Sequence, residues 1–158
     1  MSFYLIYISK ATNLLSDQDL VKILKTSRDW NHDHDITGML LYVQGCFLSL
    51  VGGRTAEETE GRFIQILEGA ETDVMETFKA IRSDERHYDL MLLRKGTAAS
   101  RSFESWDMGF RSLDLAEYKT IPGFFELDDS LLEKSDIQQS NFALNFMKSF
   151  YEMSKSKL

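Results

Sequence analysis

Three stretches of the sequence hold side chains of the types that catalyse reactions or bind metals. The tract His32–Asp35 (HDHD) has the ligand types of a metal site, but it is short and no second ligand group lies nearby in the sequence, so a solvated loop is the simpler interpretation. Cys46 and His87 would suit a nucleophile and its base, although nothing in the sequence brings them together. Ser49 lacks the context of a nucleophile elbow. We therefore expect neither a metal site nor a hydrolytic centre.

A second set of residues is polar and stands inside or beside apolar runs. Tyr7 and Ser9 are two residues apart in the run 3–9, so they point to the same face of a strand. Gln65 stands in the middle of the run 63–67, where a buried amide without partners costs about 1–3 kcal/mol. The set is completed by Asn31, Trp106 and Met108. Each residue alone is best explained as part of a satisfied core network, but together and in this order they indicate a functional site.

The strand that carries Gln65 occurs twice in the sequence. Residues 45–52 (GCFLSLVG) are echoed sixteen positions later by residues 61–69 (GRFIQILEG). Each copy begins Gly-x-Phe, continues through an apolar run and ends at glycine. The first copy has Ser49 in its middle and the second has Gln65. The two copies compete for one place in the fold.

The apolar periodicity predicts the strands and helices that must position these residues. Aromatic and β-branched runs predict strands at 3–9, 36–43, 88–94 and 105–110, besides the doubled segment. Helical spacing predicts helices at 17–30, with Ser16 as N-cap, and at 72–82. The order β-α-β-β-α-β-β resembles the split βαβ, or ferredoxin-like, arrangement. We expect an α+β fold with both helices on one face of a mixed sheet.

The sequence changes character after about residue 112. The only proline, Pro122, marks a boundary, and the chain beyond it becomes helical in pattern. Phe142, Phe146, Phe150 and Met153 form one apolar stripe. We expect a first domain at 1–112 and a C-terminal helical extension at 113–158, whose stripe packs on the sheet or against another copy of the chain.

Composition restricts the class of protein. A length of 158 residues suits one domain with an appendage, and a net charge of −7 argues against nucleic acid as a partner. Cys46 is the only cysteine, which suits a reducing compartment. We find no signal peptide and no apolar run long enough to cross a bilayer. We expect a soluble, cytoplasmic protein that does not bind membranes.

The polar set and its surroundings resemble the BLUF domains, which are blue-light sensors that use flavin. The resemblance covers roughly residues 2–112 and keeps the family's order. Its matching pieces are 7–9 (YIS), Asn31, 36–42 (ITGMLLY), 61–69 (GRFIQILEG), 84–87 (DERH) and 106–110 (WDMGF).

The resemblance implies a noncovalently bound flavin, either FAD or one of its relatives FMN and riboflavin, between the two helices above the sheet. It implies that Tyr7 donates an electron and a proton after excitation, and that Gln65 bridges Tyr7 and the flavin. A phenol is oxidisable, and a primary amide has a donor end and an acceptor end. Rotation or tautomerisation of the amide would exchange these ends. The remaining implied roles are ring contacts for Asn31, Arg86, Ile23 and Ile81, and signal relay for Ser9, Trp106 and Met108.

The resemblance also implies how the signal leaves the protein. No catalytic or DNA-binding domain is recognisable after residue 112, so we expect a photoreceptor, not an enzyme, that switches a separate response protein or its own oligomeric state. We also expect homo-oligomers. Two alternatives stay open: a flavin-dependent redox enzyme on the same fold, and a flavin-free ferredoxin-like interaction module.

The doubled segment and residue 30 depart from the family pattern. By distance from Tyr7, Ser49 occupies the usual place of the glutamine, but serine lacks the two-ended amide, so we expect Gln65 to be functional. Residues 44–60 then form an insertion, as a lengthened hairpin or a loose loop. A sharper hypothesis is that it offers a contact surface made of Phe47, Leu48, Leu50 and Val51. Trp30 stands where many relatives have a polar residue, which affects the choice or affinity of the cofactor.

Overall fold

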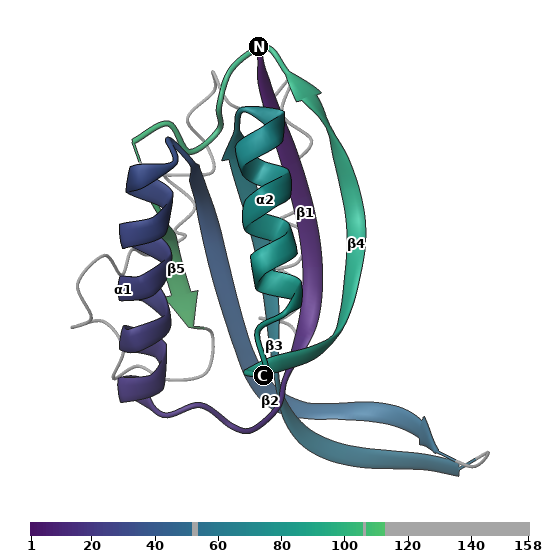
Figure 1. The fold of residues 1–158 in the computed structure, drawn as a ribbon. Coiled ribbons are helices and arrows are strands. Elements are labelled where there is room, and N and C mark those ends of the chain that lie inside the picture. The colour runs from purple at the N-terminus through teal and green to yellow at the C-terminus, as the bar shows by residue number, and fades with distance from the viewer. Residues whose placement is uncertain (52–53, 106, 113–158) are drawn as a thin grey trace, which may run out of the picture.

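The chain forms a five-stranded sheet with two helices on one face (Figure 1). The structure is a computed structural model that describes residues 1–51, 54–105 and 107–112. Its elements are β1 (Ser2–Ala11), α1 (Asp17–Asp33), β2 (Thr37–Val51), β3 (Arg54–Gly69), α2 (Glu71–Arg82), β4 (His87–Ala98) and β5 (Gly109–Ser112). The strand order is β4-β1-β3-β2-β5, with β5 parallel to β2. The predicted element order and the ferredoxin-like α+β fold are confirmed.

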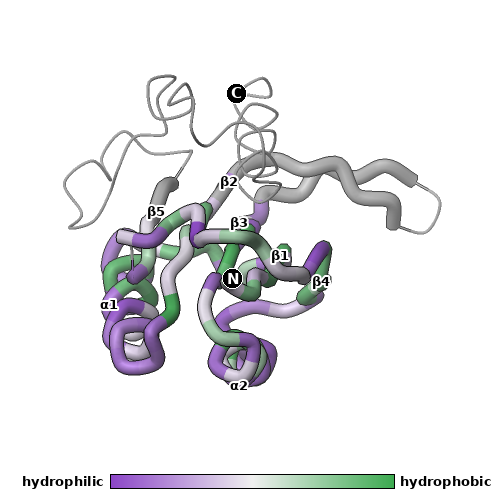
Figure 2. Tube along the Cα trace, turned by 90° about the horizontal axis from the view of Figure 1, so that it is seen from above, coloured by the Kyte–Doolittle hydropathy of each residue, from purple (hydrophilic) through white to green (hydrophobic). Residues whose placement is uncertain are grey.

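The main core lies between the sheet and the two helices. Alternate residues of β1, such as Leu5 and Tyr7, pack with Leu20 and Leu24 of α1 and Val74 of α2 in one buried cluster. Figure 2, which views the molecule from above, shows α1 and α2 on the same side of the sheet. No helix among the described residues is long and apolar enough to cross a membrane.

Helix α1 is longer than its sequence pattern predicted. It begins with a capping box, in which the Ser16 side chain accepts from Asp19 N and the Asp19 side chain accepts from Ser16 N. It continues to Asp33, and the Asn31 carbonyl accepts from Ile36 N at 2.9 Å. Asn31 therefore lies in the last turn of α1, where it is buried, and not at the helix end.

The prediction for the last strand was wrong at its start. We expected residues 105–110, whereas β5 begins at Gly109. Side chains of α1 occupy the backbone carbonyls just before it: Asn31 Nδ2 donates to Asp107 O, and Arg28 donates to Met108 O. These carbonyls are therefore not part of a strand ladder. Trp106 and the predicted extension at 113–158 lie outside the described residues.

The doubled segment folds as one long hairpin. β2 and β3 pair without a break from Thr37↔Glu68 to Val51↔Arg54, and the outer part projects beyond the sheet (Figure 1). Gln65 lies in the body of the sheet, opposite Tyr7 of β1 and Leu40 of β2, whereas Ser49 pairs with Ala56 in the projecting part. Of the two arrangements considered for residues 44–60, the lengthened hairpin is the observed one.

Candidate functional site

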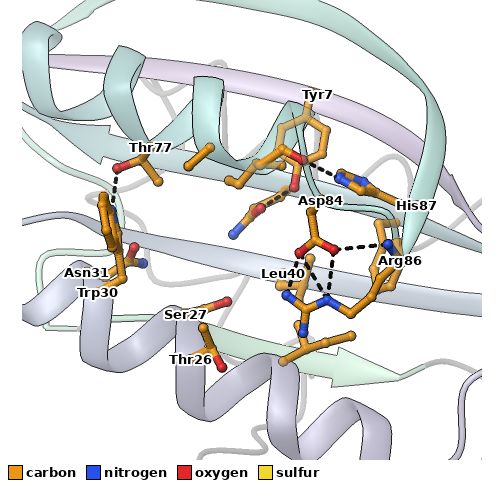
Figure 3. Close-up of a pocket in the computed structure, with 15 residues that line it drawn as sticks. Tyr7, Thr26, Ser27, Trp30, Asn31, Leu40, Thr77, Asp84, Arg86 and His87 are labelled. Carbon is orange, nitrogen blue, oxygen red and sulfur yellow. Dashed lines mark hydrogen bonds and ion pairs between the residues drawn. The ribbon is translucent and has the colours of Figure 1, made fainter.

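A cavity of about 190 Å³ lies between α1 and α2, on the face of the sheet that the helices cover. Six of its lining residues are those to which the family resemblance assigned either contact with the flavin or, for Tyr7, the photochemistry. They are Tyr7, Ile23, Asn31, Gln65, Ile81 and Arg86. Figure 3 shows side chains from α1, α2 and the sheet converging on this space. The fold thus brings together residues that are up to 79 positions apart in the sequence, from Tyr7 to Arg86.

A buried chain of hydrogen bonds crosses the floor of the cavity. The register of β1 and β3 places Tyr7 opposite Gln65, and the Tyr7 hydroxyl donates to Gln65 Oε1. Gln65 Nε2 lies 3.4 Å from Met108 Sδ and donates to it. The three side chains are 2–4% exposed. A thioether is a weak acceptor, so the amide end at Met108 is held less firmly than the end at Tyr7.

The environment of Tyr7 keeps its phenol neutral. Burial, and to a smaller extent the negative charge of Asp84, raise the pKa of Tyr7 well above its usual value. Asp84 is in turn held by Arg86, whose Nε and Nη2 groups donate to the carboxylate. These hydrogen bonds from Arg86 lower the pKa of Asp84. The carboxylate therefore stays charged beside the cavity and disfavours a tyrosinate there.

Asn31 connects α1 to the segment that leads into β5. Its Nδ2 donates to Asp107 O at 2.5 Å, and its Oδ1 accepts no hydrogen bond from the described residues. Asn31 is 2% exposed and lines the cavity. Because Asn31 lines the cavity, its Oδ1 is available to accept a hydrogen bond from an N–H group of a ligand bound there.

Ser9, which the sequence assigned to signal relay, is bound to a residue that the sequence analysis did not assign to the site. His87 Nε2 lies 2.6 Å from Ile81 O, and its Nδ1 lies 2.8 Å from Ser9 Oγ. Because a carbonyl can only accept, Nε2 carries the proton in the neutral ring and Nδ1 accepts from Ser9. His87 also lines the cavity, with its ring centre 6.3 Å from that of Tyr7. The sequence feature that could have indicated a role for His87 is its place in the DERH stretch, residues 84–87, which matches the family.

Cys46 and His87 lie on different strands, and the HDHD tract lies at the C-terminal end of α1. Cys46 pairs with Thr59 in the projecting hairpin, while His87 contacts Ser9 and Ile81. His34 caps α1 and hydrogen-bonds to Trp30 O through Nδ1. Within 1–51, 54–105 and 107–112, no group of three or more metal-binding side chains comes together.

Trp30 closes one end of the cavity. Its indole Nε1 donates to Thr77 Oγ1 of α2 at 2.8 Å, and its ring stacks on His34 with centroids 4.0 Å apart. The side chain is partly exposed and lines the cavity. The hydrogen bond joins α1 to α2 across this end, as Figure 3 shows. The departure from the family pattern at residue 30 is thus a wall that ties the two helices together.

Comparison with known proteins gives one consistent result. The family model "BLUF: Sensors of blue-light using FAD" matches residues 3–60 and 56–109, and these two matches overlap at residues 56–60, in the outer part of β3. The photoactivated adenylate cyclase subunit beta of Euglena longa is 32% identical over 99 residues, which are 63% of this chain. The chain spans about a tenth of the length of the curated relatives it matches.

Solved structures agree with the family match. The dark-state structure of BlrB, a BLUF protein, is 28% identical with a TM-score of 0.58, over 70% of this chain and 72% of that one. A structure of Klebsiella pneumoniae BlrP1 with FMN and cyclic diGMP has a TM-score of 0.66 at 25% identity, over 96% of this chain and 35% of that one.

Proposed function

The chain belongs to the BLUF family of flavin-based blue-light sensors, and on that premise we propose that the cavity between α1 and α2 holds the flavin and that Tyr7 and Gln65 carry the light response. The observation that supports this most strongly is the buried hydrogen-bond chain from Tyr7 through Gln65 to Met108. It lies at the cavity wall and contains an oxidisable phenol next to an amide with two different ends.

The cavity lining fits a flavin ring. Ile23 of α1 and Ile81 of α2 provide aliphatic side chains from opposite sides, which suits a flat aromatic system. Asn31 and Gln65 provide amide groups, and Asn31 Oδ1 lacks a donor among the described residues. An imide edge has donors and acceptors of the kind that these amides match. Arg86 would contact the carbonyl or ribityl side of the ring.

A bound flavin supplies blue-light absorption and an electron acceptor. Tyr7 is the donor, and its raised pKa means that it begins as a neutral phenol. A phenol that loses an electron becomes strongly acidic, and its hydrogen bond to Gln65 Oε1 gives the proton a path along which to leave. Asp84 favours the neutral phenol before light arrives.

Gln65 acts as a two-state element. If its amide were reversed, Nε2 would meet the Tyr7 hydroxyl and Oε1 would meet Met108 Sδ, which has no proton to donate. Tyr7 would then have to accept, and Oε1 would need a donor from the ligand or elsewhere. The two arrangements therefore present different groups to the cavity and hold Met108 differently.

The signal leaves through Met108 and β5. Met108 O accepts from Arg28 of α1, and Gly109 immediately pairs with Met39 of β2. A change at Gln65 thus reaches a segment that is tied to both α1 and the sheet. The output is a change in the interaction with a response protein or between copies of this chain in the cytoplasm. The chain acts as a sensor and not as an enzyme, although some relatives are named as cyclases.

Spectroscopy of variants tests the proposal. The purified chain should show a flavin spectrum that shifts to longer wavelength under blue light and recovers in the dark. Tyr7→Phe and Gln65→Leu should bind flavin but lose this shift, because each removes one member of the hydrogen-bond pair. Ser49→Ala, in the other copy of the doubled segment, should retain it. A normal light response in Gln65→Leu, or its loss in Ser49→Ala, would contradict the assignment.

A further inference from the structure

A second hollow of about 330 Å³ adjoins the flavin cavity and has no part in the light response described above. It is lined by the loop after β1, by one side of α1 and by the loop before β4. Its lining residues are Thr12, Asn13, Leu14, Leu15, Asp19, Lys22, Glu85 and Arg86. Arg86 lines both spaces, and Lys22 immediately precedes Ile23, which lines the first. The second hollow is therefore where a substituent leaving the first cavity on this side would lie.

Two cations in the second hollow have unused hydrogen-bonding capacity. Arg86 donates to Asp84 through Nε and Nη2, and its Nη1 donates to none of the described residues. Lys22 Nζ makes no hydrogen bond or close ion pair with the described part of the chain, although its charge interacts with that of Asp19, and the Lys22 side chain is exposed. A guanidinium and an ammonium group on residues that line one hollow are the usual contacts of a phosphate.

The acidic groups around the hollow differ in how far they oppose an anion. Asp19 accepts hydrogen bonds from Ser16 N and Ser16 Oγ at 3.0 and 2.7 Å, so it is engaged in the helix cap. The Asp84 carboxylate forms an ion pair with Arg86 and does not line the second hollow. The Glu85 carboxylate makes no hydrogen bond or ion pair with the described residues, and it is the group that repels an anion most directly.

We propose that the second hollow binds the phosphate of a flavin side chain, with Lys22 and Arg86 as its contacts, and that the chain therefore prefers FMN and FAD over riboflavin. This inference rests on the flavin site proposed above. Riboflavin has the same ring and ribityl chain but no phosphate, so the difference between the ligands isolates the phosphate. Because both cations are exposed, each contact should change affinity by only about two- to fivefold.

Binding measurements on the full chain test this directly. The flavin-free protein is titrated with riboflavin, FMN and FAD, and binding is followed by quenching of flavin fluorescence. FMN and FAD should bind more tightly than riboflavin, and inorganic phosphate should weaken FMN binding but not riboflavin binding. Lys22→Gln should reduce the preference for FMN about two- to fivefold, and Glu85→Gln should increase it, with riboflavin affinity as the reference in each case.

Lys25→Gln is the matched control. Lys25 is also exposed on α1 and lines neither space, so its replacement removes the same charge without removing a phosphate contact. Equal affinity of the wild-type chain for riboflavin and FMN would overturn the inference and leave the light-sensing proposal intact. If Lys22→Gln and Lys25→Gln reduced the preference for FMN over riboflavin equally, the inference would also be overturned. The overall electrostatic potential of the protein, and not a phosphate contact, would then explain the preference. A chain that binds no flavin would overturn the proposed function itself.

Discussion

The surroundings of Tyr7 determine the protonation state of its phenol. Its ring is buried against Phe78, with ring centroids 5.6 Å apart, and its hydroxyl is bound to Gln65. Burial and the charge of Asp84 both make the tyrosinate unfavourable. In the folded chain the phenol therefore keeps its proton at pH values where a solvent-exposed tyrosine, with a pKa of about 10, has lost half of its protons.

This difference predicts how Tyr7 responds to alkaline pH. Because its pKa is raised in the folded state, the stabilisation from the neutral phenol is complete below pH of about 10 and is lost progressively above it. In the flavin-free chain, Tyr7 should ionise only together with alkaline unfolding. The measurement is tyrosinate absorbance and circular dichroism against pH, for the wild type and Tyr7→Phe. The folded wild type and folded Tyr7→Phe should show the same tyrosinate absorbance before unfolding begins. If the wild type instead shows one additional ionised tyrosine before it unfolds, the described environment of Tyr7 is incorrect.

At the residue scale, the sequence predicted which residues line the cavity better than it predicted their hydrogen-bond partners. Tyr7 and Gln65 were noticeable because a polar group inside an apolar strand needs an explanation. The link from Ser9 through His87 to Ile81 was not predictable, because it joins β1, the start of β4 and the last turn of α2, which are far apart in the sequence. Local patterns reveal an unusual residue, but hydrogen-bond partners are set by the tertiary structure.

At the scale of elements, Glu68 anchors the connection between β4 and β5. Its carboxylate is 2% exposed and accepts from the backbone N–H groups of Ser102 and Phe103, each at 2.9 Å. Phe103 is buried beside it. This connection carries Asp107 and Met108 to the cavity, so Glu68 holds a segment on which the proposed signal route depends. The glutamate of the Leu-Glu-Gly stretch thus fixes the backbone of residues 102 and 103.

Replacing this glutamate should destabilise the chain measurably. Glu68→Gln substitutes a neutral amide for a carboxylate that accepts two buried N–H groups, and it should lower the free energy of unfolding by about 1.5–3 kcal/mol. Urea unfolding measures this difference. Glu76→Gln, on the exposed side of α2, is the control and should change stability by no more than about 0.5 kcal/mol. Equal stability of the two variants would show that Glu68 does not anchor the connection.

The elements themselves were predictable to different degrees. Strands and helices with clear periodicity, such as β1 and α2, were correct to within two residues at each end. The start of β5 was not predicted correctly. The pattern of residues 105–110 resembles a strand, but Asn31 and Arg28 bind the backbone carbonyls of Asp107 and Met108, just before β5 begins. Side chains from a distant helix decided where the ladder begins, and no local sequence feature encodes that.

At the scale of the whole molecule, the projecting hairpin is separate from the site. Tyr7, Leu40 and Gln65 lie in the body of the sheet, whereas residues 44–60 lie beyond it. Val43 pairs with Arg62, and only Gln44 and Gly61 separate this pair from residues 45–60. Removing residues 45–60 would therefore connect Gln44 directly to Gly61. The Val43–Arg62 pair would then be closed by a two-residue turn, the commonest kind in hairpins, and one of its two residues would be glycine.

The deletion of residues 45–60 should leave the fold, flavin binding and the light response intact, since the pairing on both sides of Gln65 is unchanged. Absorption spectra before and after blue light measure this, and circular dichroism reports the fold. Loss of the light response in a folded, flavin-bound deletion variant would mean that the hairpin belongs to the sensor. A retained light response with lost binding to a response protein, or with altered oligomeric state, would support the contact surface predicted for Phe47, Leu48, Leu50 and Val51.

The register of the hairpin also makes the length of the chain independent of the geometry of the site. The two echoed copies lie at different places: Ser49 pairs with Ala56 in the projecting part, and Gln65 pairs with Tyr7 and Leu40 in the body of the sheet. Because β2 and β3 pair without a break from Val51↔Arg54 to Thr37↔Glu68, adding or removing residues equally on both strands beyond Val43↔Arg62 leaves the pairs around Gln65 unchanged. The outer hairpin is therefore a position at which the protein tolerates insertions without moving the residues that line the cavity.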